Sequence, residues 1–231
     1  MVIPKNCACD EARKAAERKR TELQAEHERI ARLRKKSLLS DSMSRHVFRC
    51  WDARTEPEKR ILAICVRYVE RFAELLRNGQ GLLLWGPPGT GKTFAAGCIA
   101  NALLESGNTV ATTSVSDLMI LRGKESEEGF VGLIGNVRLM VLDDLGAERS
   151  SDYGKERLYS AIDTRYRSGK PLIVTTNLSL PQMIERKDIA DARIYDRILE
   201  KCYPVSFEGL PERRKIGAVD NFKAAKLLLE G

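Results

Sequence analysis

Two patterns of hydrophobic positions alternate along residues 57–207. Short, nearly continuous apolar runs are typical of buried strands, and they occur at 81–85, 109–113, 139–142, 172–176 and 204–207. Segments with regularly spaced apolar residues are typical of helices, and they occur at 57–78, 93–106, 116–123, 152–168 and 190–201. Strands that alternate with helices predict an α/β fold, with a mainly parallel sheet covered by helices on both faces.

Residues 1–49 follow a different pattern. Residues 10–36 carry charges at most positions and contain no Gly or Pro, and their only apolar stripe consists of Leu23, Ile30 and Leu33. This pattern indicates an exposed helix, and the polar segment 37–44 after it indicates a linker. We therefore expect a helical N-terminal extension, residues 1–49, followed by one larger domain, residues 50–231.

The positive charge of the chain is concentrated in this extension. Residues 1–49 hold 13 Lys and Arg against 7 Asp and Glu, a net charge of +6, whereas the whole chain carries +7. A basic segment suits nucleic acid or an acidic partner surface, although a solvated helix has the same composition.

The overall composition excludes two classes of protein. Hydrophobic residues make up 43% of the chain and charged residues 31%, which excludes a wholly disordered chain. No apolar run approaches the roughly 18–20 residues that cross a bilayer. The first residues also lack the apolar stretch of a signal peptide. We therefore expect a cytoplasmic protein with no membrane partner.

The cysteines are better interpreted as buried thiols than as a disulfide framework, because no export signal is seen. The six are Cys7, Cys9, Cys50, Cys65, Cys98 and Cys202. The Cys7-x-Cys9 pair resembles part of a zinc-binding module. Tetrahedral zinc needs four ligands, however, and no second Cys pair lies nearby in the sequence, so a complete zinc site is not expected.

One segment has the spacing of a phosphate-binding loop. It fits the pattern G-x-x-x-x-G-K-[ST] and consists of Gly86, Pro87, Pro88, Gly89, Thr90, Gly91, Lys92 and Thr93. The segment lies between a predicted strand and a predicted helix, which is the context that the motif requires. Glycines let backbone N–H groups approach phosphate oxygens, Lys92 would reach the β- and γ-phosphates, and the Thr93 hydroxyl would bind Mg²⁺. The motif predicts that ATP and Mg²⁺ are bound here.

Polar residues follow two of the other predicted strands. Asp143 and Asp144 end the apolar run 139–142, and Asn177 ends the run 172–176. Beside a phosphate loop, Asp143 would hold the shell of the Mg²⁺ ion and Asp144 would polarise the attacking water. Asn177 would orient that water without adding a charge. Taken alone, acids or an Asn after a strand are also common in turns.

Two arginines lie on the last predicted helix. Arg193 and Arg197 are four residues apart, so they project from one face of that helix. Such a pair is often only a solvated surface. The more specific interpretation is an arginine that reaches the nucleotide of a neighbouring subunit.

In this order, the phosphate loop, paired Asp, terminal Asn and R-x-x-x-R resemble the motifs of an AAA+ ATPase. The stretches 141–149, 157–166 and 170–178 are similar to those of DnaC/DnaI-type replicative helicase loaders, especially phage and prophage versions, and the resemblance covers about residues 45–215. It implies a P-loop NTPase (AAA+) fold of three αβα layers. It also implies that the full C-terminal lid of most AAA+ proteins is missing, because only 24 residues follow Phe207.

The resemblance also implies roles for particular residues. Lys92 and Thr93 match the Walker A pair, Asp143 and Asp144 the Walker B pair, and Asn177 sensor 1. Arg197 matches the arginine finger, with Arg193 as the second choice, and Arg213 falls where an arginine can serve as sensor 2. Arg122 and Lys124 fall in a region that contacts single-stranded DNA in initiators and loaders.

The function implied by the resemblance is that of a helicase loader. Subunits with bound ATP would assemble, attach to a DnaB-type hexameric helicase through the N-terminal extension, and place it on single-stranded DNA. Hydrolysis at the subunit interfaces would permit release. The alternative is an IstB-like ATPase that acts with a transposase on duplex DNA. A third possibility, from a different class, is a nucleotide-gated interaction module with negligible turnover.

Overall fold

The computed structural model describes residues 43–120, 134–146, 152–186 and 188–212, together with the isolated positions 14, 17, 18, 20 and 132. The predicted helix at 10–36 therefore lies almost wholly outside the described residues. So do several predicted site residues, namely Cys7, Cys9, Arg122, Lys124 and Arg213.

Five strands of the described chain form one sheet in the order β2-β3-β4-β1-β5. They are β1 (Gly81–Trp85), β2 (Val110–Ser114), β3 (Leu139–Leu145), β4 (Leu172–Thr176) and β5 (Cys202–Ser206). Every pairing between neighbouring strands is parallel. The carboxyl ends of all the strands therefore meet at one edge of the sheet, which is where open parallel sheets bind ligands.

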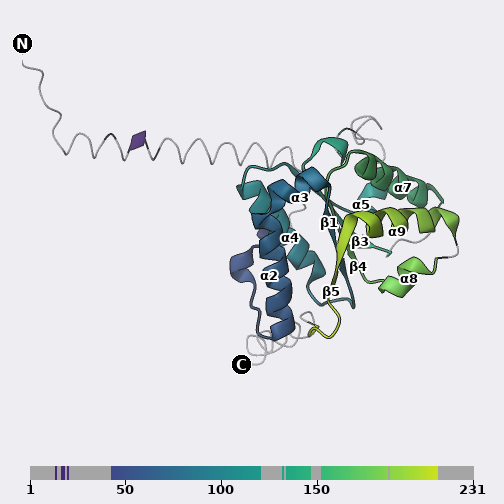
Figure 1. Ribbon diagram of the computed structural model, residues 1–231, viewed down its shortest axis with the longest axis horizontal. Helices are drawn as coiled ribbons and strands as arrows, with labels where there is room; N and C mark the ends of the chain where they lie inside the picture. The colour runs from purple at the N-terminus through teal and green to yellow at the C-terminus, as the bar shows by residue number, and fades with distance from the viewer. Residues whose placement is uncertain are drawn as a thin grey trace, which may run out of the picture.

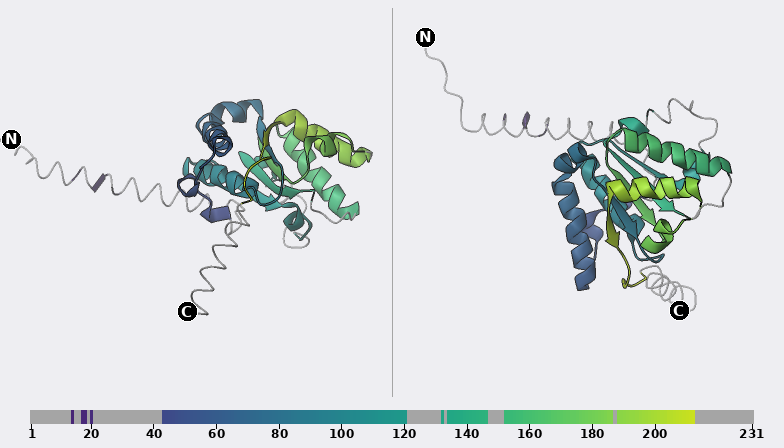
Figure 2. Two further views of the ribbon diagram at one scale, coloured as in Figure 1. Left: turned by 90° about the horizontal axis from the view of Figure 1, so that it is seen from below. Right: turned by 45° about the vertical axis from the view of Figure 1, so that its right-hand side comes forward.

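Helices cover both faces of this sheet (Figures 1 and 2). One face carries α2 (Glu56–Glu70), α3 (Phe72–Asn78) and α4 (Lys92–Glu105). The other carries α5 (Val115–Ile120), α7 (Asp152–Arg167), α8 (Leu180–Ile184) and α9 (Ile189–Lys201). Side chains of β1 alternate between two apolar clusters, with Leu82 and Leu84 in one and Leu83 and Trp85 in the other. The predicted three-layer αβα architecture is confirmed.

The structure differs from the sequence-based expectation in four places, the first being β3, which continues three residues beyond the predicted run 139–142 and so includes Asp143 and Asp144. The helix predicted at 57–78 is divided at Arg71, whose backbone (φ −98°, ψ 14°) leaves the helical region, and Phe72 begins the next helix buried beside Tyr68. Strand β5 begins two residues before the predicted run 204–207, because Cys202 is buried and pairs with Gly81 of β1. The short helix α8 was not predicted, although Ser179 and Gln182 form a reciprocal capping box at its start.

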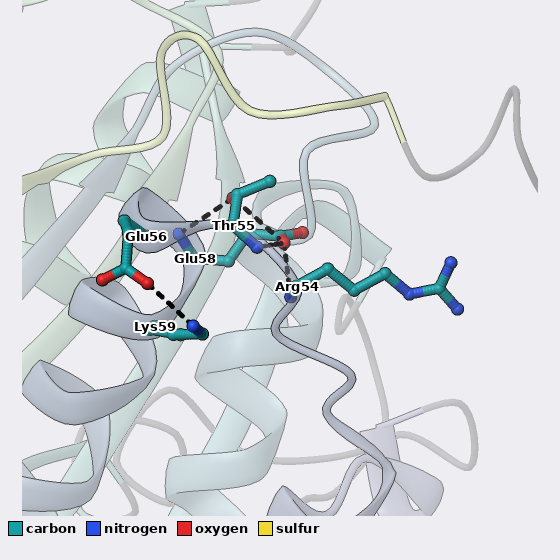
Figure 3. A network of polar contacts seen from close by, with 5 residues as sticks. All are labelled: Arg54, Thr55, Glu56, Glu58 and Lys59. Atoms are coloured by element: carbon teal, nitrogen blue, oxygen red, sulfur yellow. Dashed lines mark hydrogen bonds and ion pairs between the residues drawn. The ribbon is translucent and has the colours of Figure 1, made fainter.

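A second capping box fixes the start of α2 (Figure 3). The Oε2 atom of the buried Glu58 accepts hydrogen bonds from the backbone N–H groups of Arg54 and Thr55, both at 2.9 Å. The Thr55 hydroxyl in turn accepts from the Glu58 N–H at 3.4 Å. On the exposed side of the same turn, Lys59 pairs with Glu56 at 2.7 Å. This network sets the direction in which the chain enters α2.

The segment before α2 is held against α4. The side-chain amide of Asn101, on α4, donates to the carbonyls of Met43 and His46 at 2.8 Å each. The His46 ring lies so close to Gly97 of α4 that a Cβ atom there would come within 2.6 Å of its Nδ1. Residues from Met43 onward are thus packed onto the helix that follows the phosphate loop.

Arg165, in the last turn of α7, is a buried cation. All of its hydrogen bonds go to backbone carbonyls. Its five N–H groups donate to Ile134, Val137, Arg138 and, twice, Pro171, at 2.6–3.0 Å. The side chain is 1% exposed, and burial lowers the pKa of its guanidinium to about 10, so it stays charged at neutral pH. It joins the segments that lead into β3 and β4.

We expect Arg165→Met to lower the free energy of unfolding by about 3 kcal/mol or more, because several buried carbonyls lose their donors at once. Arg167→Met, two residues along the same helix, is the matched control. The Arg167 side chain is 79% exposed and contacts Asp163 only at 3.7 Å, so its loss should cost under about 0.5 kcal/mol. Urea unfolding followed by circular dichroism measures both. Equal stabilities of the two variants would contradict this role for Arg165.

Candidate nucleotide-binding site

The predicted phosphate loop lies between β1 and α4, and its backbone needs glycine. Gly86, Gly89 and Gly91 have φ angles of 137°, 80° and 99°, which residues with a Cβ atom rarely adopt. At Gly86 a Cβ atom would also lie only 3.1 Å from the backbone of Phe207. The glycines therefore permit the tight loop that a phosphate group requires.

Lys92 lies inside this loop. Its Nζ donates to the carbonyl oxygens of Gly86 at 2.8 Å and Pro87 at 2.6 Å, and the side chain is buried. The Thr90 hydroxyl also donates to the Pro87 carbonyl, at 2.9 Å. Because Lys92 is the first residue of α4, its charge adds to the positive end of that helix. The loop is therefore a site for an anion.

The predicted metal ligands lie together. Asp143, near the end of β3, accepts a hydrogen bond at its Oδ1 from the Thr93 hydroxyl at 2.9 Å. Burial raises the pKa of Asp143 above its ordinary value, while the hydrogen bonds from Thr175 and Thr93 lower it in part. A hydroxyl and a carboxylate are oxygen ligands of the kind that Mg²⁺ prefers. These two residues therefore fit a Mg²⁺ ion beside the phosphate loop.

Asp144 and Asn177 are also brought together. The Nδ2 group of Asn177, directly after β4, donates to the Asp144 Oδ1 at 3.1 Å. Both side chains are exposed at the carboxyl edge of the sheet. Residues predicted from separate motifs thus lie close together at this edge, namely Thr93 at the start of α4 and the strand-end residues Asp143, Asp144 and Asn177.

Thr175 was not predicted as part of this site. Its hydroxyl, on β4, donates to the Asp143 Oδ1 at 2.6 Å and accepts from the Asp144 N–H at 2.9 Å. The available signal was a polar residue inside the otherwise apolar run Leu172–Thr176, but threonine is also a common strand residue.

An aromatic pocket adjoins the phosphate loop and was likewise missed. It is lined by Trp51, Glu58, Ile61, Thr90, Gly91, Phe94, Phe207 and Leu210. The rings of Trp51 and Phe94 meet edge to face with their centroids 5.5 Å apart. These rings thus pack against each other beside the phosphate loop. The lining comes from four separate parts of the chain, so no local pattern could reveal it.

The two candidate arginines differ in their surroundings. Arg197 lies against α7, where it pairs with Asp163 at 2.6 Å and its guanidinium lies 4.9 Å and 5.4 Å from the ring centroids of Tyr159 and Tyr166. Arg193, one turn earlier on α9, is exposed. Both lie on one helix, as predicted, and their roles at a subunit interface stay predictions.

Comparison with known families identifies the family of the chain. The family described as IstB-like ATP binding protein matches residues 15–217, most of the chain. The chain belongs to this family. Its members are described as ATP-binding, in agreement with the phosphate loop and the carboxylates around it. The arrangement of Lys92, Thr93 and Asp143 is consistent with this family description.

Individual relatives of this IstB-like protein include helicase loaders. It is 30% identical over 149 residues to the replicative helicase loader DnaC of Escherichia coli K12, covering 62% of this chain and 58% of the relative. It is 32% identical over 130 residues to the uncharacterized protein YdaV of Escherichia coli K12, covering 54% of this chain and 51% of the relative. The chain thus spans little more than half the length of these curated relatives.

Solved structures confirm the AAA+ fold. The structure of DnaI matches with a TM-score of 0.62 at 23% identity, covering 74% of this chain and 95% of DnaI. That of the DnaC helicase loader matches with a TM-score of 0.61 at 24% identity, covering 72% and 99%. AMPPCP-bound DnaA from Aquifex aeolicus matches with 0.56 at 19% identity, covering 78% and 55%. At these identities the likeness establishes the fold.

Three other predictions concern parts of the chain that the structure describes only in part or not at all. Within the described ranges, no group of three or more His, Cys, Asp and Glu residues is placed to hold a metal ion, and the Cys7-x-Cys9 pair lies outside them. No helix in the described part is both long and apolar enough to cross a bilayer. The predicted absence of a full lid concerns residues 213–231, which the structure does not describe.

Proposed function

We propose that this protein is an ATPase that loads a DnaB-type hexameric replicative helicase onto single-stranded DNA. The observation that carries the proposal is the meeting of Lys92, Thr93, Asp143, Asp144 and Asn177 at one edge of the sheet. The 30% identity to the replicative helicase loader DnaC supports the choice of loader over other AAA+ functions.

The residues of the site have different roles in ATP binding and hydrolysis. Backbone N–H groups of residues 86–91 and the Lys92 ammonium bind the phosphates. Thr93 and Asp143 hold Mg²⁺, which neutralises charge on the phosphate oxygens when it is bound. Asp144 accepts a proton from the attacking water, and the Asn177 amide fixes the direction of the Asp144 carboxylate through its 3.1 Å hydrogen bond.

Assembly places the site at an interface between subunits. Arg197, or in second place Arg193, reaches the γ-phosphate bound by the neighbouring subunit. Arg122 and Lys124 contact the phosphates of single-stranded DNA, and the basic extension of residues 1–49 holds the helicase through Leu23, Ile30 and Leu33. Such a protein acts in the cytoplasm, where the replication machinery is found.

The second candidate is a helper ATPase that acts with a transposase on duplex DNA. The family description, IstB-like ATP binding protein, favours it. The two candidates predict different DNA partners. A loader binds single strands only with ATP, and this binding weakens as salt rises, because counterions are released on binding. Tight duplex binding without ATP would instead favour the transposition role.

We expect the N-terminal extension to be needed for helicase capture but not for nucleotide binding. A protein lacking residues 1–41 keeps Met43 and His46, which pack on α4, and should bind ATP and melt at the same temperature as the full chain. It should fail to retain the helicase in a pull-down.

Two full-length variants separate the apolar stripe of the extension from its charge. Replacing Leu23, Ile30 and Leu33 by Ala should remove helicase capture, whereas replacing Arg32 and Arg34 by Gln should leave most of it. A DNA titration on the same proteins shows whether the charges serve DNA instead. Undiminished capture by the shortened protein would exclude helicase docking through the extension.

A further inference from the structure

Thr175 occupies a special position between the two carboxylates of the site. Its hydroxyl donates to the Oδ1 atom of Asp143 at 2.6 Å and accepts from the backbone N–H of Asp144 at 2.9 Å. One hydroxyl can do both, because it carries one donor hydrogen and two acceptor lone pairs. The Thr175 side chain is 1% exposed, so water cannot easily replace it in either bond.

The backbone of Asp144 explains why this acceptor is needed. Asp144 has a φ angle of 60°, which non-glycine residues seldom adopt. The pairing of β3 with β4 also shifts register between Leu142 and Leu145. At such an irregularity the regular ladder is interrupted, and an N–H group must find another acceptor. The Thr175 hydroxyl supplies it for Asp144.

The neighbouring Thr176 binds the backbone just after the same register shift. Its hydroxyl donates to the Leu145 carbonyl at 2.7 Å and accepts from the Leu178 N–H at 3.1 Å. Thr176 therefore contacts the backbone around the site, whereas Thr175 contacts Asp143 and Asp144 themselves. The two threonines offer a matched pair for experiment.

Thr175 also differs from the other hydroxyl on Asp143. Thr93 donates to the same Oδ1 atom at 2.9 Å, but Thr93 is itself an expected Mg²⁺ ligand. Its hydroxyl oxygen would then face the metal. Thr175 is held on a central strand and has no expected metal contact. Its hydrogen bond can therefore keep Asp143 oriented both when Thr93 binds Asp143 and when Thr93 binds the metal.

We propose that Thr175 is a positioning residue that fixes Asp143 and Asp144 relative to each other. Asp143 is the carboxylate that would hold the metal, and Asp144 is the one that would activate water. This inference rests on the proposed ATPase function. It predicts that loss of one hydroxyl disturbs both Mg²⁺-dependent nucleotide binding and turnover, because both carboxylates lose a fixed contact.

The test compares Thr175→Val, which removes the hydroxyl, with Thr175→Ser, which keeps it, and with Thr176→Val. The first measurement is amide hydrogen exchange at Asp144 in protein without nucleotide or metal. The second is the gain in affinity for a non-hydrolysable ATP analogue when Mg²⁺ is added. The third is kcat and KM for ATP.

Thr175→Val should speed exchange at the Asp144 amide at least about tenfold, reduce the Mg²⁺-dependent gain in affinity with a matching rise in KM for ATP, and lower kcat about 10- to 100-fold. Thr175→Ser should restore all three values. Thr176→Val should lower the melting temperature but keep most of the Mg²⁺-dependent gain. A merely structural role for Thr175 would change the melting temperature and the exchange rate but leave the Mg²⁺-dependent gain in affinity and kcat at their wild-type values.

The proposal is overturned if Thr175→Val keeps the wild-type exchange rate and Mg²⁺ dependence, or if Thr175→Ser is as impaired as Thr175→Val. The first two measurements need neither turnover nor helicase. A wild-type protein that binds the analogue but never hydrolyses ATP would therefore contradict the proposed function, while these two measurements still decide the role of Thr175.

Discussion

Arg197→Ala is expected to lower assembly-dependent ATP hydrolysis by about 10³- to 10⁵-fold, the range of arginine fingers in GTPases. Nucleotide binding by isolated subunits should stay near normal, because the arginine acts on the neighbour's phosphate. Phosphate release from the assembled protein and binding of a fluorescent ATP analogue to dilute protein measure the two effects. Loss of binding by dilute protein would place Arg197 in its own subunit's pocket or in the fold.

The contacts of Arg197 within its own chain require a control for stability. Its pairing with Asp163 and its stacking on Tyr159 and Tyr166 join α9 to α7, so the substitution also removes packing. Arg193→Ala, one turn earlier and exposed, is the matched comparison. If Arg193→Ala instead carries the large loss of turnover, the second choice of finger is the correct one.

Mixed assemblies show directly whether Arg197 acts across an interface. A subunit with Lys92→Ala lacks its own phosphate-binding charge but still offers Arg197 to a neighbour. A subunit with Arg197→Ala keeps its nucleotide site. Mixing these two inactive proteins should restore part of the hydrolysis, because some interfaces then combine an intact site with an intact arginine. No recovery at any mixing ratio would contradict action in trans.

Asp144→Asn is expected to reduce ATP turnover by about 10²- to 10⁴-fold while nucleotide affinity stays within a few fold, because the amide cannot accept the proton of the attacking water. Asn is the appropriate replacement, since it tolerates the positive φ of 60° that Asp144 adopts. It also keeps a carbonyl oxygen that can accept from Asn177. Phosphate release and equilibrium binding of ATP are the measurements.

Lys92→Ala provides the contrasting result. It removes the cation inside the phosphate loop and should weaken ATP binding itself. The two variants therefore separate binding from chemistry. Hydrolysis by Asp144→Asn at the wild-type rate would show that another group activates the water.

Most of the fold could be predicted because buried parallel strands are nearly continuous apolar runs. Each strand of the described sheet lies within two or three residues of a predicted run. The phosphate loop and the strand-end residues Asp143, Asp144 and Asn177 were equally predictable. Their motifs are local, and a parallel sheet brings strand ends together.

The features that were missed depend on contacts between distant parts of the chain. Thr175 and Asp143 are 32 residues apart, and the role of Thr175 follows from a register shift that no hydrophobic pattern encodes. Trp51 comes beside the phosphate loop only when the segment before α2 packs against Phe94. Arg165 looks like one of several surface arginines of α7 until the carbonyls of the preceding loops surround it.

The most direct test of the proposed function is the transfer of a DnaB-type hexameric replicative helicase onto closed circular single-stranded DNA, followed by counting helicase on the isolated circles. A closed circle excludes threading from an end, so the ring must be placed by a loader. The wild-type chain with ATP and Mg²⁺ should load the helicase, and Lys92→Ala should not. Helicase on the circles in equal amounts with Lys92→Ala, or without the protein, would contradict ATP-dependent loading by this protein.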